Sequence, residues 1–508
     1  MPENIINNIK SKVSKRFKSS FLTTFIGGIL VHLYVLTNKL PNHDSALSIY
    51  FDQDMSISGR FSLQYLAGIS SYFDLQWVNG LLAILYLALT VALLIEIFDI
   101  KKKLTQILLS ALFITFPSVA ATFSYMYTAD AYMLATTLAV LGVYLLFKYE
   151  KGFFISILLF YISLSTYQAN LSIIILLILL KFVLEFWKDN LRVALILKSI
   201  LTMGASLGIY VIHFKIYSIV GDKSLTSYKG INDAGNISFK MILNRIPQTY
   251  LDTFNFYFGK LGYQNFFDYL NIVIAVLLVL MLIEIIKRQK KLINFNKISS
   301  VVLLVLIFPI ITHVIYFMSP GVTYHLLMKH SLVFVYIGIL IIYDNVPSTT
   351  TNKMSIFNSY VTVLTLSLVA FNFALISNIG YFNLQLKYEK SYALALKVSD
   401  RFEQLDNYNQ AQRVVVIGSP KFDDSYIQKA FREKTPVMVG INEESLFHYT
   451  STSRFQHFLA SYVGVNLQPI NITTVDNLTE TVEFEEMEKW PSKKSVKIIE
   501  DVVFIKFQ

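Results

Sequence analysis

Residues 76–98 read QWVNGLLAILYLALTVALLIEIF, an apolar run in which Glu96 is the only charged residue. About 20 consecutive apolar residues in a helix span the hydrocarbon core of a bilayer, which is roughly 30 Å thick. The run therefore predicts a transmembrane helix. Comparable runs recur along the chain, and we expect eleven spans in all, at residues 20–37, 76–98, 104–123, 131–147, 153–167, 169–187, 195–217, 269–286, 298–318, 329–343 and 356–378.

The composition points to the same class of protein. The chain has 508 residues, of which 54% are hydrophobic and 15% are charged, and its mean hydropathy is +0.51. Soluble domains average about 25% charged residues, so an ordinary soluble enzyme and a disordered chain are both excluded. The absence of cysteine from the sequence also excludes disulfides, thiolate catalysis and cysteine-ligated metals.

The distribution of Lys and Arg predicts the orientation in the membrane. Cytoplasmic loops carry an excess of basic residues, and the N-terminal segment holds Lys10, Lys12, Lys15, Arg16 and Lys18. With this segment inside, 20 of the 29 basic residues before residue 380 are cytoplasmic and 9 are outside. The net charge of +10 is then explained by topology, and we expect no nucleic-acid partner.

Charged residues become denser near residue 380, which predicts a domain boundary. We expect a transmembrane domain at residues 1–379, with outer loops at 38–75 and 218–268. An odd number of spans places residues 380–508 outside, where their patterns indicate a small α/β domain. These patterns predict an amphipathic helix at 386–406, strands at 413–418 and 436–440, and a hairpin at 495–506 with an acidic turn.

The first outer loop carries the residues best suited to chemistry. Asp44 comes shortly after the first span, and a carboxylate there suits a general base toward an acceptor hydroxyl. Arg60 offers a planar fork for a phosphate or carboxylate. Asp52 and Asp54 are further carboxylates that a folded loop brings within reach of the same cavity. A helix cap at Asp44 and solvated charges elsewhere are equally compatible with this spacing.

Three other clusters are candidates for substrate binding. Tyr127 and Asp130 stand at the outer start of a span, where the carboxylate binds sugar hydroxyls or a metal, or else caps the helix. Tyr167 and Gln168 separate two apolar runs, and polar groups at that depth either join helices or line a cavity. The third cluster lies at the outer end of a later span and suits a phosphate, although a lone histidine is usually structural: His325, Lys329 and His330.

In their order along the chain these segments resemble the bacterial integral-membrane glucosyltransferases of the Gtr type, which add side sugars to O-antigens and related surface glycans. The resemblance rests on Asp44 with Ser58-Gly59-Arg60, Pro117 with residues 124–134, Tyr167-Gln168-Ala169, the helix Tyr388–Tyr392 and residues 490–506. The chain departs from the pattern at three places: Ser45 follows Asp44 in place of a second Asp, Phe61 follows Arg60 in place of Pro, and Lys329-His330 replaces an expected Arg.

The resemblance implies a GT-C-like, polytopic α-helical enzyme that transfers a sugar, expected to be glucose, outside the cytoplasmic membrane. It assigns Asp44 as the catalytic carboxylate in an inverting single displacement from which a polyprenyl phosphate leaves. The implied partners are a polyprenyl-phosphate sugar donor, a glycan acceptor, the lipid bilayer, a separate donor-synthesising transferase and a flippase. No cofactor is certain, and a divalent cation (Mg or Mn) stays open because some members of the wider class need one.

Two other functions are compatible with the same features. A transporter or flippase for a lipid-linked glycan also has many spans and buried polar groups, but transporters often show inverted repeats and helices broken near the midplane. A glycan polymerase or ligase has a similar outer loop. Which sugar, which acceptor, which linkage and which oligomeric state apply does not follow from the sequence.

The orientation is tested with reporter fusions. An alkaline phosphatase fused near residue 400 is expected to be active. The basic residues place the N-terminus inside, and an odd number of spans then brings residue 400 to the outside. An inactive phosphatase together with an active cytoplasmic reporter at the same position contradicts both the number of spans and the side of the membrane.

Overall fold

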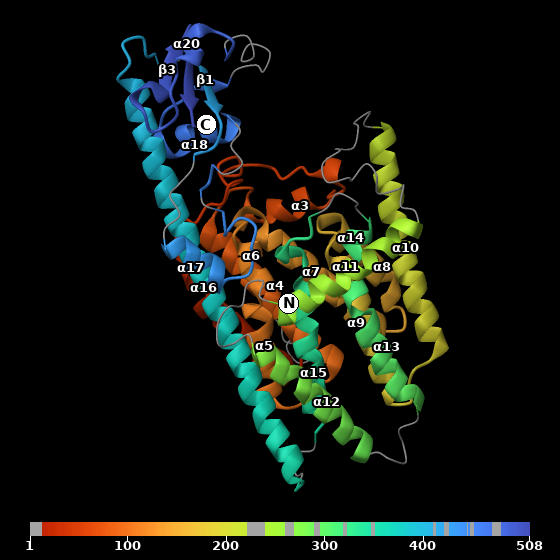
Figure 1. The fold of residues 1–508 in the computed structure, drawn as a ribbon. Helices are drawn as coiled ribbons and strands as arrows, with labels where there is room; N and C mark the ends of the chain where they lie inside the picture. The colour runs from red at the N-terminus through yellow and green to blue at the C-terminus, as the bar shows by residue number, and fades with distance from the viewer. Residues whose placement is uncertain are drawn as a thin grey trace, which may run out of the picture.

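The computed structural model is mostly helical, with a small sheet at one end of a helical bundle (Figure 1). It describes residues 13–220, 239–259, 269–288, 295–318, 323–346, 351–409, 413–420, 426–443, 445–447, 452–469 and 479–507. The bundle helices are α2 (Lys15–Thr37), α3 (Leu63–Ala67), α4 (Gln76–Phe98), α5 (Lys103–Thr115), α6 (Pro117–Phe123), α7 (Met126–Lys148), α8 (Gly152–Thr166), α9 (Asn170–Trp187), α10 (Val193–Val220), α11 (Phe239–Phe258), α12 (Leu270–Arg288), α13 (Phe295–Thr312), α14 (Val314–Met318), α15 (Phe334–Asp344) and α16 (Lys353–Glu403).

The prediction of a polytopic helical membrane protein is confirmed in its general form. Within the described residues, seven helices are long and apolar enough to cross a membrane, or eight if a bent pair counts as one span. Three more apolar helices are shorter, at Gly152–Thr166, Leu270–Met281 and His330–Asp344. Each predicted span coincides with one or two of these helices, but the total of eleven stays a prediction because the short ones fall below the usual spanning length.

Two of the predicted boundaries differ from the structure for local reasons. The run 104–123 is not one helix, because Pro117 has no N–H to continue the ladder and begins a new helix, α6, at an angle of 44° to α5. The outer loop 218–268 contains the amphipathic α11 in its middle, and its parts 221–238 and 260–268 lie outside the described residues. The sequence therefore overestimated the irregular part of this loop.

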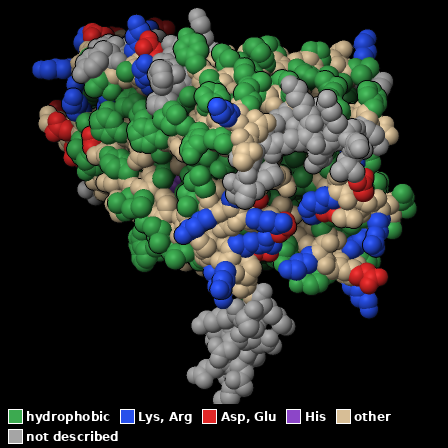
Figure 2. Space-filling model, turned by 90° about the horizontal axis from the view of Figure 1, so that it is seen from below, with side chains coloured by type: hydrophobic (Ala, Val, Ile, Leu, Met, Phe, Trp, Pro, Cys, Tyr) green, Lys and Arg blue, Asp and Glu red, His purple; other side chains and the backbone are tan. Residues whose placement is uncertain are grey.

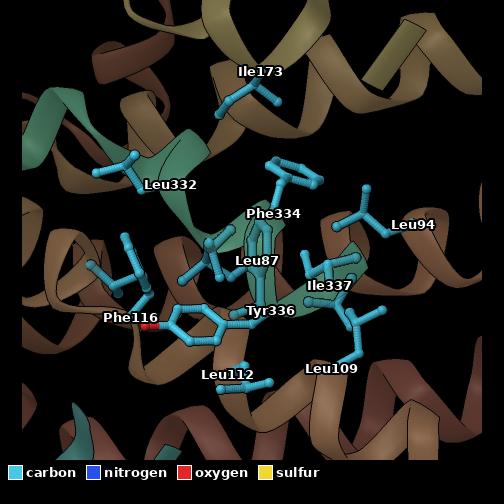
Figure 3. Close-up of a cluster of buried hydrophobic side chains, with 14 of the residues drawn as sticks. Leu87, Leu94, Leu109, Leu112, Phe116, Ile173, Leu332, Phe334, Tyr336 and Ile337 are labelled. Carbon is cyan, nitrogen blue, oxygen red and sulfur yellow. The ribbon is translucent and has the colours of Figure 1, made fainter. Parts of the chain in front are cut away.

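The core of the bundle is built from branched and aromatic side chains that close-packed helices share. α4 packs against α2 and α7, and α7 packs against α8. Figure 3 shows Leu87 and Leu94 of α4 beside Leu109 and Leu112 of α5, with Phe334, Tyr336 and Ile337 of α15 against them. All of these side chains are buried. The packing holds the outer ends of α4, α6 and α7 in fixed positions around the first outer loop.

Polar side chains inside this core are paired across helices. His32 of α2 lies 2.7 Å from the Tyr381 hydroxyl of α16 and 2.8 Å from the Ile114 carbonyl oxygen of α5. The Thr90 hydroxyl of α4 lies 3.0 Å from that of Thr137 on α7. Such groups are costly in an apolar environment unless they are hydrogen-bonded, so these pairs select one arrangement of the helices.

The C-terminal residues form a mixed α/β structure on the outer extension of α16. Strands β1 (Arg413–Ile417), β2 (Gln468–Pro469), β3 (Val496–Ile499) and β4 (Val502–Lys506) have the order β2-β1-β4-β3. β1 is parallel to β2 and β4, and β3 and β4 form an antiparallel hairpin. The helical segments of this part are α17 (Tyr426–Lys434), α18 (Thr452–Phe458), the π-turn Leu459–Val463 and α20 (Val482–Glu485).

The sequence located most of these elements. The strand near 413, the hairpin with Glu500 and Asp501 in its turn, and a helix at 386–406 are all present, the last as the continuation of α16. The predicted strand at 436–440 is wrong. Residues 439 and 440 form a turn, in which the Gly440 oxygen accepts from Lys387 of α16, and the neighbouring Ile441 oxygen accepts from Asn383 at 2.6 Å.

The basic residues gather on the end of the bundle opposite the sheet. Figure 2 views this end and shows many Lys and Arg side chains there. Described basic residues at the ends of helices on this side include Lys101, Lys103, Lys148, Lys151 and Arg192. This asymmetry in the folded molecule agrees with the asymmetry counted in the sequence.

One buried ion pair joins the bundle to the C-terminal residues, and it generates a stability prediction. Lys387 Nζ of α16 lies 3.1 Å from Glu443 Oε2, and only 1% and 9% of the two side chains are exposed. Lys387→Ala leaves a buried carboxylate without its partner, which should lower the free energy of unfolding by about 3–5 kcal/mol. The measurement is thermal or denaturant unfolding in detergent.

Lys397→Ala is the matched control, because Lys397 lies on the same helix and is exposed. It should change the free energy of unfolding by no more than about 0.5 kcal/mol. Equal stability of the two variants would contradict the role given to the Lys387–Glu443 pair.

Candidate active site

The turn that carries Asp44 is fixed to the bundle by Asn42. The Asn42 side-chain oxygen accepts from the backbone N–H groups of Asp44 at 2.8 Å and Ser45 at 3.1 Å. The Asn42 amide donates to the Ser124 carbonyl oxygen at 2.6 Å, at the junction of α6 and α7. This type of turn, in which an Asn side chain replaces a backbone acceptor, is common for Asn. It places Asp44 at a defined point on the outer end of α7.

The Asp44 carboxylate contacts a residue of the C-terminal part. Arg454 Nη2, on α18, donates to Asp44 Oδ1 at 2.7 Å, and His43 Nε2 lies 3.3 Å from Asp44 Oδ2. About a third of the Asp44 side chain remains exposed. The alternative in which Asp44 caps a helix is not what the structure shows, because the next described helical turn begins only at Ser56.

The buried Lys387–Glu443 pair lies on the other side of His43 from Asp44. Glu443 Oε1 is 4.0 Å from His43 Nδ1 and accepts from the Gly440 N–H at 2.8 Å. Burial acts to raise the pKa of Glu443, but the Lys387 charge, the Gly440 hydrogen bond and His43 outweigh it and hold the pKa below its ordinary value. Glu443 is therefore a fixed negative charge on the far side of His43 from Asp44.

Gly440 approaches the bundle more closely than any other residue type allows. Its φ of +88° is left-handed, and a Cβ at this position would lie 2.7 Å from Ser124 Oγ and 3.1 Å from the Tyr125 ring. Tyr125 in turn meets the His43 ring edge to face at 6.1 Å. The segment around Gly440 and the turn around Asn42 therefore meet at one place, the α6–α7 junction.

A second cluster surrounds Arg60. Its guanidinium donates to the Tyr132 hydroxyl at 2.9 Å and lies 5.9 and 5.8 Å from the ring centres of Tyr132 and Tyr167. The two rings are stacked at 4.4 Å. Gln168 supports the loop before Arg60 by donating to the Ser58 carbonyl oxygen at 2.9 Å. The sequence predicted Arg60, Tyr167 and Gln168 separately, and the structure brings them together.

The backbone that presents Arg60 needs a glycine. Gly59 has a φ of +74°, and a Cβ there would lie 2.5 Å from the Tyr210 hydroxyl of α10. That hydroxyl donates to the Gly59 carbonyl oxygen at 3.1 Å. The Ser58-Gly59-Arg60 motif therefore has a physical reason: a tight left-handed turn before α3 that packs against Tyr210 of α10 and directs Arg60 toward Tyr132.

A small cavity with a mainly apolar lining and a few polar groups adjoins this cluster. It lies among α7, the start of α9 and the short helical segments before α15, and is lined by Thr122, Tyr132, Met133, Thr136, Tyr167, Ala169, Asn170, Ile173, Leu327, Met328, His330 and Ser331. Three buried polar atoms of these residues have no hydrogen-bond partner within the described part of the chain: Tyr167 Oη, His330 Nε2 and Ser331 Oγ. Buried polar groups are normally satisfied, so these atoms are suited to bind an ordered water.

Of the remaining predicted binding residues, two are buried in the bundle and two are exposed on the first outer loop. Tyr127 is buried in α7, hydrogen-bonds to the Ser48 side chain and lies within electrostatic range of Asp44. Asp130 is 1% exposed and accepts from Asn79 at 3.3 Å. It does not cap α7, because that helix begins at Met126. Asp52 and Asp54 are exposed, and each accepts a backbone hydrogen bond from its own loop.

Of the third predicted cluster, His325, Lys329 and His330, only His330 lines the cavity. His330 Nδ1 lies 2.6 Å from the Ser118 hydroxyl of α6, and its ring lines the cavity. Lys329 Nζ stands 5.3 Å from the centre of the Tyr324 ring. His325 precedes the short helical turn Leu326–Met328 and does not line the cavity. The joint phosphate site of all three residues thus stays a prediction.

Two functional candidates were not predicted. Arg454 is 410 positions from Asp44 in sequence, and no local pattern signals such a contact. Asp74 lies at the end of the first outer loop, just before α4, and is buried. Burial raises the pKa of Asp74 to about 6, against the opposing effects of Lys39 and Gln76. It is a buried carboxylate in the same loop as Asp44.

A metal site is not evident near Asp44. Among the residues that the structure describes, no group of three or more His, Asp or Glu side chains is placed to hold a metal ion. The Asp44 carboxylate lies between Arg454 and His43, a donor set that does not fit a divalent cation.

The comparisons with known proteins give one match. No curated protein and no solved structure matches the chain. The family model described as glucosyl transferase GtrII matches residues 33–345. This range contains Asp44, Arg60 and every residue that lines the cavity, and it ends before the C-terminal residues that carry Arg454. It covers more than half of the sequence, and the chain belongs to the GtrII glucosyl transferase family.

Proposed function

We propose that this membrane glucosyltransferase moves glucose from a polyprenyl-phosphate donor to a glycan acceptor at the outer face of the cytoplasmic membrane. Asp44 acts as the general base, and Arg60 binds the donor phosphate. The observation that carries the proposal is the position of Asp44: a partly exposed carboxylate, on a fixed turn, within the segment that the family model matches. The family assignment favours transfer over the alternatives of a transporter, flippase or polymerase.

The transfer is a single displacement. The acceptor oxygen forms a bond to the anomeric carbon while the bond from that carbon to the phosphate oxygen breaks. The acceptor proton passes to Asp44, and the electron pair of the broken bond leaves with the polyprenyl phosphate. Because the nucleophile enters opposite the leaving group, the configuration at the anomeric carbon is inverted. A base and a phosphate-binding group on opposite sides of the sugar are sufficient for this step.

Both sites adjoin α7, which supports this assignment. Tyr127 lies within electrostatic range of Asp44, and the Tyr132 hydroxyl accepts from Arg60. The stacked Tyr132 and Tyr167 rings line the cavity, and aromatic faces with nearby polar groups are suited to a sugar. We place the sugar between Asp44 and Arg60.

The first prediction concerns the base. Asp44→Asn keeps the size of the side chain and removes its proton affinity, so turnover should fall by about 10²–10⁴-fold while donor binding stays close to normal. The assay is transfer from polyprenyl-phosphate glucose by the purified enzyme in nanodiscs. Asp52→Asn and Asp54→Asn are the matched controls, because both side chains are exposed in the same loop, and both should remain active.

Asp74 is the main competitor for this role. Near-native turnover of Asp44→Asn together with loss of activity in Asp74→Asn would transfer the role of base to Asp74. Activity in all four Asn variants would remove the first outer loop from the chemistry altogether.

The second prediction concerns the donor. Arg60→Ala removes a charged hydrogen-bond donor, which should cost about 1.5–3 kcal/mol, or roughly 10–100-fold in donor use. Arg60→Lys should recover only part, because a point charge does not replace a bidentate fork. The measurement is kcat/KM for the donor. Gln64→Ala, a change in the same loop, is the control, and full activity of Arg60→Ala would return the phosphate site to Lys329 and His330.

A further inference from the structure

Arg454 reaches Asp44 from a rigid support. It lies on α18, where Phe455 and Phe458 are buried in the core of the C-terminal part. The first residue of this helix, Thr452, accepts from the Val416 N–H of β1 through its hydroxyl at 3.2 Å. The guanidinium is therefore held by the sheet and its core. The distance of 2.7 Å between Arg454 Nη2 and Asp44 Oδ1 follows from the position of α18 in this domain.

His43 holds the carboxylate from the other side. Its Nε2 lies 3.3 Å from Asp44 Oδ2, and Glu443 lies 4.0 Å from its Nδ1. Glu443 is fixed in turn by Lys387 of α16. The two oxygens of Asp44 thus have different neighbours, Arg454 at Oδ1 and His43 at Oδ2. This arrangement sets both the position and the rotation of the carboxylate.

We propose that Arg454 is a positioning residue of the glucosyl transfer, so that the C-terminal domain completes an active site whose base lies in the first outer loop. The inference rests on the proposed function of Asp44 as the base. Arg454 orients Asp44 toward the acceptor and favours its ionised form, because a cation in contact with a carboxylate stabilises the negative charge. Arginine itself keeps its proton at every step, so the acceptor proton resides on Asp44 until water removes it.

A role in docking the C-terminal domain is the alternative explanation. The contact between Arg454 and Asp44 is partly exposed, with 24% and 33% of the two side chains accessible, and exposed ion pairs contribute only about 0–1 kcal/mol. The domain has stronger attachments, namely the buried Lys387–Glu443 pair and the continuous helix α16. Loss of Arg454 should therefore leave the domain in place and change the behaviour of Asp44.

The two roles predict different pH dependence. Among the residues that the structure describes, Arg454 from α18 and His43 from its own loop contact Asp44, Tyr127 of α7 lies within electrostatic range of it, and Glu443 and Lys387 stand behind His43. Removal of the Arg454 charge should make Asp44 easier to protonate. The acid limb of the pH–rate profile should then move to higher pH by about one to three units.

The experiment measures kcat and KM against pH for the full-length enzyme in nanodiscs, with polyprenyl-phosphate glucose as the donor. Arg454→Gln should show the shifted acid limb and, about one pH unit below its own limb, a loss of kcat of about five- to tenfold relative to the wild type at the same pH, with donor KM within about twofold of the wild-type value. Arg454→Lys should restore part of the limb toward its original position. Arg413→Gln is the matched control, because Arg413 pairs with the exposed Asp501 in the same domain, and its profile should equal that of the wild type.

His43 contacts the same carboxylate, so the comparison is repeated in a His43→Gln background. Persistence of the shift there supports Arg454 acting on Asp44. The inference is overturned if Arg454→Gln lowers the rate without moving the limb, or if Arg413→Gln moves it equally. The Asp44→Asn variant distinguishes a failure of the proposed function from a failure of this inference. Near-native activity of Asp44→Asn overturns the assignment of the base. An inactive Asp44→Asn together with an unmoved limb in Arg454→Gln overturns only the positioning role.

Discussion

The contact between Lys387 and Glu443 is the constraint on which the outer half of this molecule depends. A lysine ammonium and a carboxylate are both strongly disfavoured in a buried site unless they are paired and hydrogen-bonded. The pair satisfies this requirement only when the segment around Gly440 lies against α16, where the Gly440 oxygen also accepts from Lys387. Once the segment is there, Gly440 touches the α6–α7 junction and Glu443 stands beside His43. The charge requirement of one pair thereby places three distant parts of the chain around Asp44.

The requirement that buried polar groups be paired also determines how the helices of the bundle are arranged. The hydrophobic effect selects no particular arrangement among apolar helices, because lipid is as apolar as leucine. Paired polar groups supply the selection: His32 with Tyr381, and Thr90 with Thr137. Each pair excludes arrangements in which either partner would be buried alone. This explains why α7, rich in Thr, Tyr and Ala, is central to the packing and also carries Tyr127 and Tyr132, the neighbours of both halves of the candidate site.

What the sequence could predict follows from the range of the interactions involved. Apolar runs predicted the positions of the apolar helices, because helix formation and burial are local properties of a run, although the run at 104–123 forms two helices. Asp44, Arg60, Tyr167 and Gln168 were proposed as site residues because motif and depth are also local, and their roles stay predictions. The strand at 436–440 failed because Pro436-Val-Met-Val-Gly440 has strand-like composition, while its partner is a helix side chain, Lys387. Arg454 could not be found for a similar reason: its partner is in the first outer loop, and nothing near either residue in sequence indicates the contact.

The candidate site contains residues from inside and from outside the segment that the family model matches. The matched residues 33–345 contain the proposed base, the Arg60 cluster and the cavity, and these are the parts that any transfer from a phosphate donor requires. Arg454 and Glu443 lie beyond them, yet Arg454 contacts the base directly and Glu443 acts through His43. A carboxylate on an exposed turn would otherwise rotate freely. The C-terminal part supplies the charges that contact it, so the environment of the proposed base is set by a region separate from the proposed donor site. Under this proposal, changes in the C-terminal part alter the acceptor side of the reaction while the Arg60 cluster beside α7, α9 and α10 stays as it is.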